Sequence, residues 1–153
     1  MRKTKGFTLI ELLVVIAIIG LLSTLAVVAL NSARSKARDA KRIADIKQVQ
    51  TALELYFNDN NRYPGESGTP TAVITAVLGT GSYACLGTAG WSTSGCAAPY
   101  MGLVPSNPGP DGTPYTYVRP SSEGSYSIVF TLIGQTGGLT TGLTTATPDG
   151  FSQ

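Results

Sequence analysis

The chain opens on a long apolar run. Between Phe7 and Ala33 the only charged residue is Glu11, and the other positions are apolar, glycine or small polar residues. An α-helix rises about 1.5 Å per residue, so roughly 20 apolar residues cross a hydrocarbon core of about 30 Å. Residues 7–31 are therefore predicted to form a helix that crosses a membrane or is buried among other helices.

The next segment, residues 32–61, keeps a helical period but becomes amphipathic. Its apolar residues recur in steps of three and four: Ala33, Ala37, Ala40, Ile43, Ala44, Ile46, Val49, Leu53, Tyr56 and Phe57. The asparagine-rich run 58–61 favours a turn, and Pro64 prevents the helix from continuing. We expect one helix from about residue 7 to about residue 58. At about 75 Å, it is too long for one small domain to cover.

Basic residues gather in the first part of the amphipathic segment. Lys41 and Arg42 are both spaced for an ion pair with Asp45 across one turn. The run 34–42 is interpreted as a solvated or subunit-facing flank, and contact with lipid phosphates or DNA is the alternative. Because no aromatic residues alternate with these charges, the sequence gives DNA binding no specific support.

The second half of the chain predicts a small antiparallel sheet. Residues 113–118 and 125–133 alternate in polarity and are enriched in β-branched and aromatic residues. Residues 119–124 provide a hairpin connection, and a third strand is expected near 142–147, whereas 70–78 is ambiguous between helix and strand. The apolar face of such a sheet needs a cover, which the amphipathic half of the helix supplies. The predicted fold is α+β, with one long N-terminal helix packed through its C-terminal half on the sheet.

The N-terminus carries a short motif. The basic leader MRKTKG is too short and polar for a secretory signal peptide, and the apolar run follows it. The stretch GFTLIE, residues 6–11, resembles the class III signal of type IV pilins and type II secretion pseudopilins. The resemblance implies a pilin-like fold. It also implies that a prepilin peptidase removes residues 1–6 by cutting after Gly6, and that Phe7 is then N-methylated.

Glu11 is the chemical centre of the apolar helix. A carboxylate in lipid is costly unless it is paired or protonated. Cleavage after Gly6 creates an ammonium group at Phe7, and a charge-assisted hydrogen bond with that group satisfies both charges. In the family this contact joins the glutamate of an incoming subunit to the N-terminus of a subunit already in the filament. The resemblance thus implies an assembly role; without it, a glutamate that snorkels to the interface is an equal interpretation.

The two cysteines become informative once the orientation is considered. A count of basic residues on the two flanks does not favour a cytoplasmic leader, but the pilin resemblance does. It places the chain beyond the apolar helix outside the membrane, where disulfides form. We expect a disulfide between Cys85 and Cys96. The alternatives are weaker, because a zinc site needs more ligands and the chain has no histidine and no CxxC spacing.

Composition argues against several classes of function. The chain has 11 Lys and Arg against 9 Asp and Glu, and three of the basic residues lie in the leader. The apparent basicity therefore belongs partly to a targeting signal. There is no histidine, no nucleophile with an evident base, scattered carboxylates and no phosphate-binding motif. We expect no enzymatic activity and no cofactor.

Major secretion pseudopilins have a calcium site in their C-terminal loop, built with several carboxylates. Here the corresponding stretch, residues 134–150, contains only Asp149, and Asp111 lies far upstream. Calcium takes six to eight oxygen ligands, usually including carboxylates. We therefore do not transfer the calcium site to this chain, expect no metal, and favour a pilin over a secretion pseudopilin.

The leading hypothesis is a structural subunit of a type IV pilus-like filament. Residues 7–31 form its core, residues 32–61 continue the helix, and the head at 62–153 lies outermost. The implied partners are further copies of the chain, other pilins, the prepilin peptidase, and an inner-membrane assembly platform with its ATPase. Before assembly the subunit spans the inner membrane, in contact with lipid, with its head outside. Afterwards it belongs to a surface filament. The main alternative is a type II secretion pseudopilin; a membrane-tethered adhesin or binding module, which works with Glu11 neutralised, is less favoured.

Overall fold

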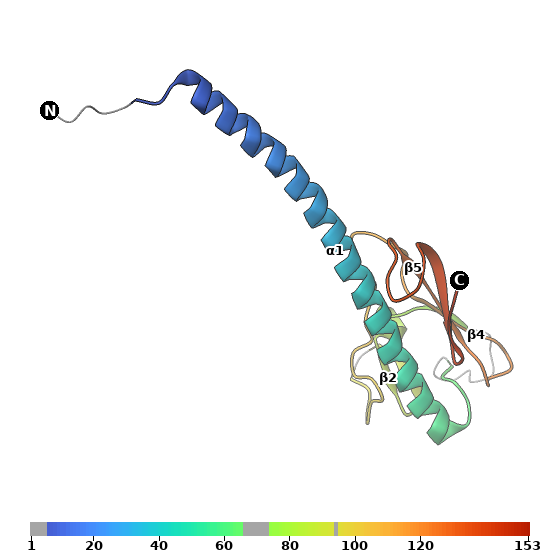
Figure 1. Cartoon of the computed structure of the whole chain (residues 1–153). Helices are drawn as coiled ribbons and strands as arrows, with labels where there is room; N and C mark the ends of the chain where they lie inside the picture. Colours follow the sequence, from blue (N-terminus) through green and yellow to red (C-terminus); the bar gives the residue numbers. More distant parts are fainter. Residues whose placement is uncertain (1–5, 66–73, 94) are drawn as a thin grey trace. The chain divides into compact units, whose positions relative to one another are not determined.

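A computed structural model describes residues 6–65, 74–93 and 95–153. These residues form one long helix, α1 (Leu9–Asn60), and two antiparallel sheets, as Figure 1 shows. The chain divides into two compact units, Met1–Ser35 and Lys36–Gln153. The second unit, which contains the C-terminal half of α1 and all the strands, is called the head below. The predicted α+β architecture with one N-terminal helix and an antiparallel sheet is confirmed.

α1 ends two residues beyond the expected position, and asparagines end it. Asn61 takes a left-handed backbone conformation with φ of 52°. Asparagine tolerates this conformation better than most residues, and it is a common way to end a helix. The Asn61 N–H donates to the carbonyl of Phe57 at 2.7 Å, and the Asn60 side chain donates to the carbonyl of Tyr56 at 2.9 Å. The last turn of the helix is therefore capped.

The larger sheet has five strands in the order β1-β4-β5-β6-β7. They are β1 (Ile74–Val77), β4 (Thr116–Arg119), β5 (Ser127–Leu132), β6 (Gly142–Thr147) and β7 (Gly150–Ser152). The three expected strands are present as β4, β5 and β6. Of the two edge strands, the sequence left β1 ambiguous and did not predict β7. β1 falls in the ambiguous stretch 70–78, of which 70–73 lie outside the described residues, and three-residue β7 is too short to show a period.

A smaller hairpin carries the disulfide. A short 3₁₀ turn, η1 (Gly81–Tyr83), leads into β2 (Cys85–Gly87) and β3 (Gly90–Ser92), which pair with each other. Cys85 and Cys96 are joined as predicted, with their Cα atoms 6.2 Å apart. Trp91 on β3 is only 2% exposed and packs edge-on against Tyr117 of the larger sheet, with ring centroids 5.3 Å apart. The hairpin is thereby attached to the main core.

Removing the disulfide should destabilise the head. The bridge spans 11 residues of sequence, and closing such a loop restricts the unfolded chain by about 3 kcal/mol in the loop-entropy description. We expect the variant Cys85→Ala/Cys96→Ala to lose about that much free energy of unfolding in denaturant titrations followed by tryptophan fluorescence. Wild-type protein in reductant is the matched control and should shift in the same direction. Equal unfolding midpoints for the variant and the oxidised wild type would refute a stabilising role.

The core of the head lies between α1 and one face of the five-stranded sheet. Ile46, Val49 and Leu53 of α1 are fully buried against alternate residues of the strands, such as Ile128 and Phe130 of β5. This alternation of buried and partly exposed positions is typical of a sheet covered on one face. The amphipathic half of α1 thus supplies the cover that the sequence predicted.

The start of this helical face differs from the prediction. The expected apolar stripe included Ala37, Ala40 and Ala44, but all three are exposed. The buried side chains there are Asp39 and Arg42, each 0% exposed. Alanine gains little from burial because its side chain is small. A paired aspartate and arginine that contact the neighbouring loops therefore determine which side of this turn faces inward.

Candidate functional site

The predicted cleavage site lies in the segment that precedes the helix. Gly6 and Phe7 come before Leu9, the first residue of α1, and both are exposed, Phe7 by 88%. Proteases preferentially cut exposed segments that are not held in regular structure. The Gly6–Phe7 bond is thus accessible to a peptidase. Residues 1–5 of the leader lie outside the described residues.

Glu11 caps the first turn of α1. Its Oε2 atom accepts hydrogen bonds from the Thr8 backbone N–H at 2.8 Å and from the Thr8 hydroxyl at 2.7 Å. In return, the Glu11 N–H donates to Thr8 Oγ1 at 3.3 Å. This reciprocal arrangement is a capping box, which satisfies backbone donors at a helix start. Thr8 was missed in the sequence analysis, although Thr-x-x-Glu ahead of an apolar run is the signature of this motif.

The cap leaves part of the glutamate available. All three hydrogen bonds involve Oε2 or Thr8, and Oε1 has no donor among the described residues. The cap also needs no atom N-terminal to Phe7, because Thr8 supplies both donors. It is therefore compatible with removal of the leader. Oε1 is thus free to accept a further donor whether or not the leader is present.

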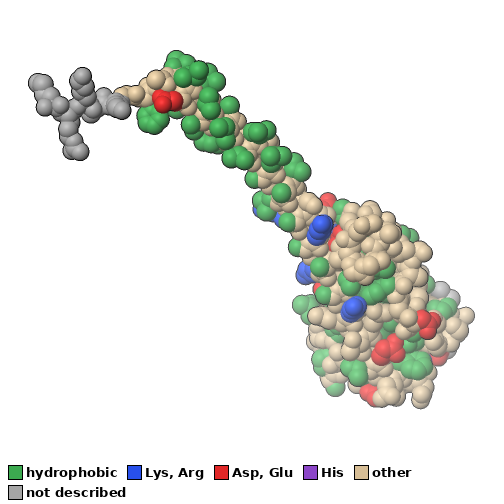
Figure 2. Space-filling view, in the orientation of Figure 1, with side chains coloured by type: hydrophobic (Ala, Val, Ile, Leu, Met, Phe, Trp, Pro, Cys, Tyr) green, Lys and Arg blue, Asp and Glu red, His purple; other side chains and the backbone are tan. Residues whose placement is uncertain are grey.

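The first half of α1 displays an apolar surface. Its large hydrophobic side chains are 47–81% exposed between Leu9 and Leu30. Figure 2 shows such side chains covering this part of the helix. By length and composition α1 is able to cross a membrane. An apolar surface of this extent indicates contact with lipid or with other protein chains.

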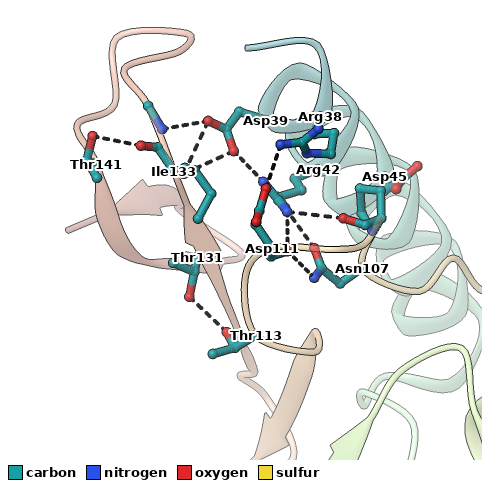
Figure 3. A network of polar contacts seen from close by, with 12 residues as sticks. Arg38, Asp39, Arg42, Asp45, Asn107, Asp111, Thr113, Thr131, Ile133 and Thr141 are labelled. Carbon is teal, nitrogen blue, oxygen red and sulfur yellow. Dashed lines mark hydrogen bonds and ion pairs between the residues drawn. The ribbon is translucent and has the colours of Figure 1, made fainter. Parts of the chain in front are cut away.

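Within the head, a buried ion pair lies on the first turns of α1 that belong to this unit. Arg42 Nη1 donates to Asp39 Oδ1 at 2.6 Å, and both side chains are fully buried. The Asp39 carboxylate also accepts the backbone N–H of Ile133 at 3.1 Å and that of Gly134 at 2.7 Å. These contacts, drawn in Figure 3, attach α1 to the chain that follows β5.

The remaining Arg42 donors bind the loop that precedes β4. Nε donates to Asn107 Oδ1 at 2.7 Å, while Nη2 donates to the carbonyls of Pro108, at 3.1 Å, and Asp111. A Cβ atom on Gly112 would lie 3.1 Å from Nη2, and Gly112 has φ of +87°. Glycine is suited to both the close approach and the conformation. One guanidinium group therefore holds this loop against α1.

The pairing of Arg42 corrects one prediction. The sequence spacing predicts ion pairs from both Lys41 and Arg42 to Asp45, with the basic run as a solvated or subunit-facing flank. The Lys41–Asp45 pair is present at 3.7 Å, but Arg42 binds Asp39 instead. Arg38 is also engaged, in an ion pair with Asp111 at 2.5 Å. The Asp39–Arg42 spacing of three residues was visible in the sequence, yet spacing alone does not tell which charges face the core.

Several tyrosine hydroxyls donate to carboxylates of α1. Tyr115 donates to Asp45 at 3.2 Å, and Tyr63 donates to Glu54 at 2.9 Å. Burial, together with the neighbouring carboxylate, raises the pKa of both tyrosines above its usual range. Burial also raises the pKa of Tyr126 to about 12. These phenols therefore stay protonated at physiological pH, and those of Tyr63 and Tyr115 act as hydrogen-bond donors.

Comparisons with known proteins find similar sequences for both the N-terminal segment and the head. Residues 1–27 match the family model for the prokaryotic N-terminal methylation motif, and residues 29–142 match that for type II secretion system protein G. Type II secretion system core protein G of Aeromonas hydrophila is 34% identical over 130 residues, which cover 83% of this chain and 81% of the relative. The protein of the same name from Vibrio cholerae serotype O1 is 33% identical over 144 residues, covering 93% and 90%. No solved structure matches the chain.

Proposed function

Because the chain belongs to the type II secretion system protein G family, we propose that it is a structural pseudopilin subunit that assembles into a helical filament through α1. The exposed apolar surface between Leu9 and Leu30 carries this proposal. Family membership favours the secretion pseudopilin, which the sequence analysis gave as the alternative to a pilin. A pilus-like filament is compatible with it, since both use the same mode of assembly.

The subunit is held in the membrane before it assembles. The apolar half of α1 crosses the inner membrane, and the disulfide-containing head lies on the outer side. A prepilin peptidase cuts the exposed Gly6–Phe7 bond, and Phe7 becomes the methylated N-terminus. The same apolar surface then leaves lipid for contacts with α1 of other copies, so burial is maintained throughout.

Glu11 sets the register between neighbouring copies. Its free carboxylate oxygen accepts a charge-assisted hydrogen bond from the Phe7 ammonium group of another subunit. The contact is head-to-tail, so it repeats along a filament without closing. The other pseudopilins, the assembly platform and its ATPase supply the functions that a structural subunit lacks.

The first test is processing. Intact-mass measurement and N-terminal sequencing of the wild-type protein should give a chain that begins at N-methyl-Phe7. The variant Gly6→Val should keep its leader, because a branched side chain then occupies the cleavage position. Gly20→Ala is the matched control and should be processed normally, since a Cβ atom there meets nothing within 4 Å. A wild-type chain that begins at Met1 would refute the proposal.

The fraction that contains the mature chain separates the two kinds of filament. A secretion pseudopilin should remain with the membranes at natural expression levels, whereas a pilus subunit should be abundant in sheared surface material. Both outcomes need the processed N-terminus, so this comparison is made on the same samples as the mass measurement.

A further inference from the structure

The calcium site implied by the pseudopilin resemblance does not fit the residues of this head. Residues 133–141, which connect β5 to β6, contain no carboxylate. Asp149 is exposed in the turn between β6 and β7, and Asp111 is paired with Arg38. In the described ranges 6–65, 74–93 and 95–153, no three residues among His, Cys, Asp and Glu are grouped to hold a metal ion. The donor set that calcium requires is therefore not assembled there.

The start of the β5–β6 connection presents hydrogen-bond donors, which bind an anion and not a cation. The N–H groups of Ile133 and Gly134 both point to the Asp39 carboxylate. Two convergent backbone donors bind an anion, and here α1 supplies that anion covalently. A carboxylate from the helix consequently holds this connection. A calcium site would instead need oxygen atoms of the connection to point toward the metal ion.

The oxygen atoms that would suit calcium converge elsewhere and are already in use. Asn107 Oδ1, the carbonyls of Pro108 and Asp111, and Asp39 Oδ1 all accept hydrogen bonds from Arg42. Amide, carbonyl and carboxylate oxygens are the ligand types that calcium takes. The guanidinium group occupies their centre, carries a permanent positive charge and is fully buried.

We propose that Arg42, paired with Asp39, is an internal cation that takes the structural role of a bound calcium ion. The head then folds and assembles without calcium. The guanidinium group holds the loop before β4, and through Asp39 it holds the chain after β5. A cation that is part of the chain is not lost when the surrounding calcium concentration falls. This inference concerns the head and does not depend on the assembly contact proposed for Glu11.

The test compares the thermal unfolding of the full-length processed protein, in detergent micelles, with a calcium chelator and with about 1 mM calcium, the range in which extracellular calcium modules bind. We expect the same Tm in both conditions. A head that binds calcium with a Kd about tenfold below this calcium concentration would gain about 5 °C in Tm. Such a gain, or calcium binding to the wild-type protein in isothermal titration calorimetry, would overturn the proposal.

Two variants connect the result to Arg42. Arg42→Met should lower the Tm by more than about 10 °C, equally with and without calcium, because it leaves the buried Asp39 carboxylate without its cationic partner. Arg38→Met is the matched control: it removes a neighbouring, partly exposed ion pair and should change the Tm by only a few degrees. Equal effects of the two variants would also overturn the proposal. If Arg42→Met does not fold, the wild-type comparison still decides the question of calcium.

Discussion

Replacing Glu11 with glutamine is expected to lower filament assembly by roughly 10- to 100-fold while the first turn of α1 stays capped. A capping box accepts glutamine in place of glutamate, because the amide oxygen still accepts the Thr8 donors. The remaining amide group is then an NH₂, which carries no charge and cannot accept a hydrogen bond from the ammonium group of a neighbouring Phe7. Assembly is measured as the amount of cross-linked multimers or sheared filaments per processed subunit.

The variant Thr8→Val provides the matched control for Glu11→Gln. It removes the hydroxyl group that takes part in the cap, but it keeps the carboxylate that is proposed to bind the neighbouring subunit. We expect assembly to be close to that of the wild type. The opposite pattern, with assembly lost in Thr8→Val and kept in Glu11→Gln, would show that Glu11 acts through the helix cap alone. N-terminal sequencing of both variants excludes a defect in processing.

The N-terminal motif can be recognised from the sequence because its signals are local. The motif at residues 6–11 is contiguous, and the apolar run after it needs no tertiary information to be recognised. The strands β4, β5 and β6 were also found, since each shows enough alternation to be separated from loop sequence. The amphipathic half of α1 also predicted that this helix packs on the strands.

The buried pair Asp39–Arg42 was not predicted, for a physical reason. Charged residues on a helix are usually solvated, so periodicity assigns them to the outer face. Here donors and acceptors from segments more than 60 residues away satisfy both charges. The local sequence pattern does not predict those distant partners. The exposed alanines at this level of α1 were misassigned for the same reason, because the inward direction is set by polar contacts and not by apolar area.

Breaking the Asp39–Arg42 pair is expected to have the largest effect on the stability of the head. Asp39 accepts from Arg42, Ile133 and Gly134 with its two oxygens. Asp39→Asn keeps the size of the side chain, but its NH₂ group would face one of these donors. Removing one partner of a buried ion pair typically costs about 3–5 kcal/mol. We expect a loss of that size in the free energy of unfolding, measured by denaturant titration of the processed protein in detergent.

The control is Asp45→Asn on the next turn of α1, and a double variant completes the experiment. Asp45 has a weaker pair with Lys41 at 3.7 Å and a hydrogen bond from Tyr115, so its loss should cost about 1 kcal/mol. The double variant Asp39→Asn/Arg42→Met removes both charges, and its cost should be clearly smaller than the sum of the two single variants. Strictly additive costs would show that the two residues stabilise the head independently. A coupled result would identify one ion pair, on one turn of α1, as the element that holds the two loops of the head together.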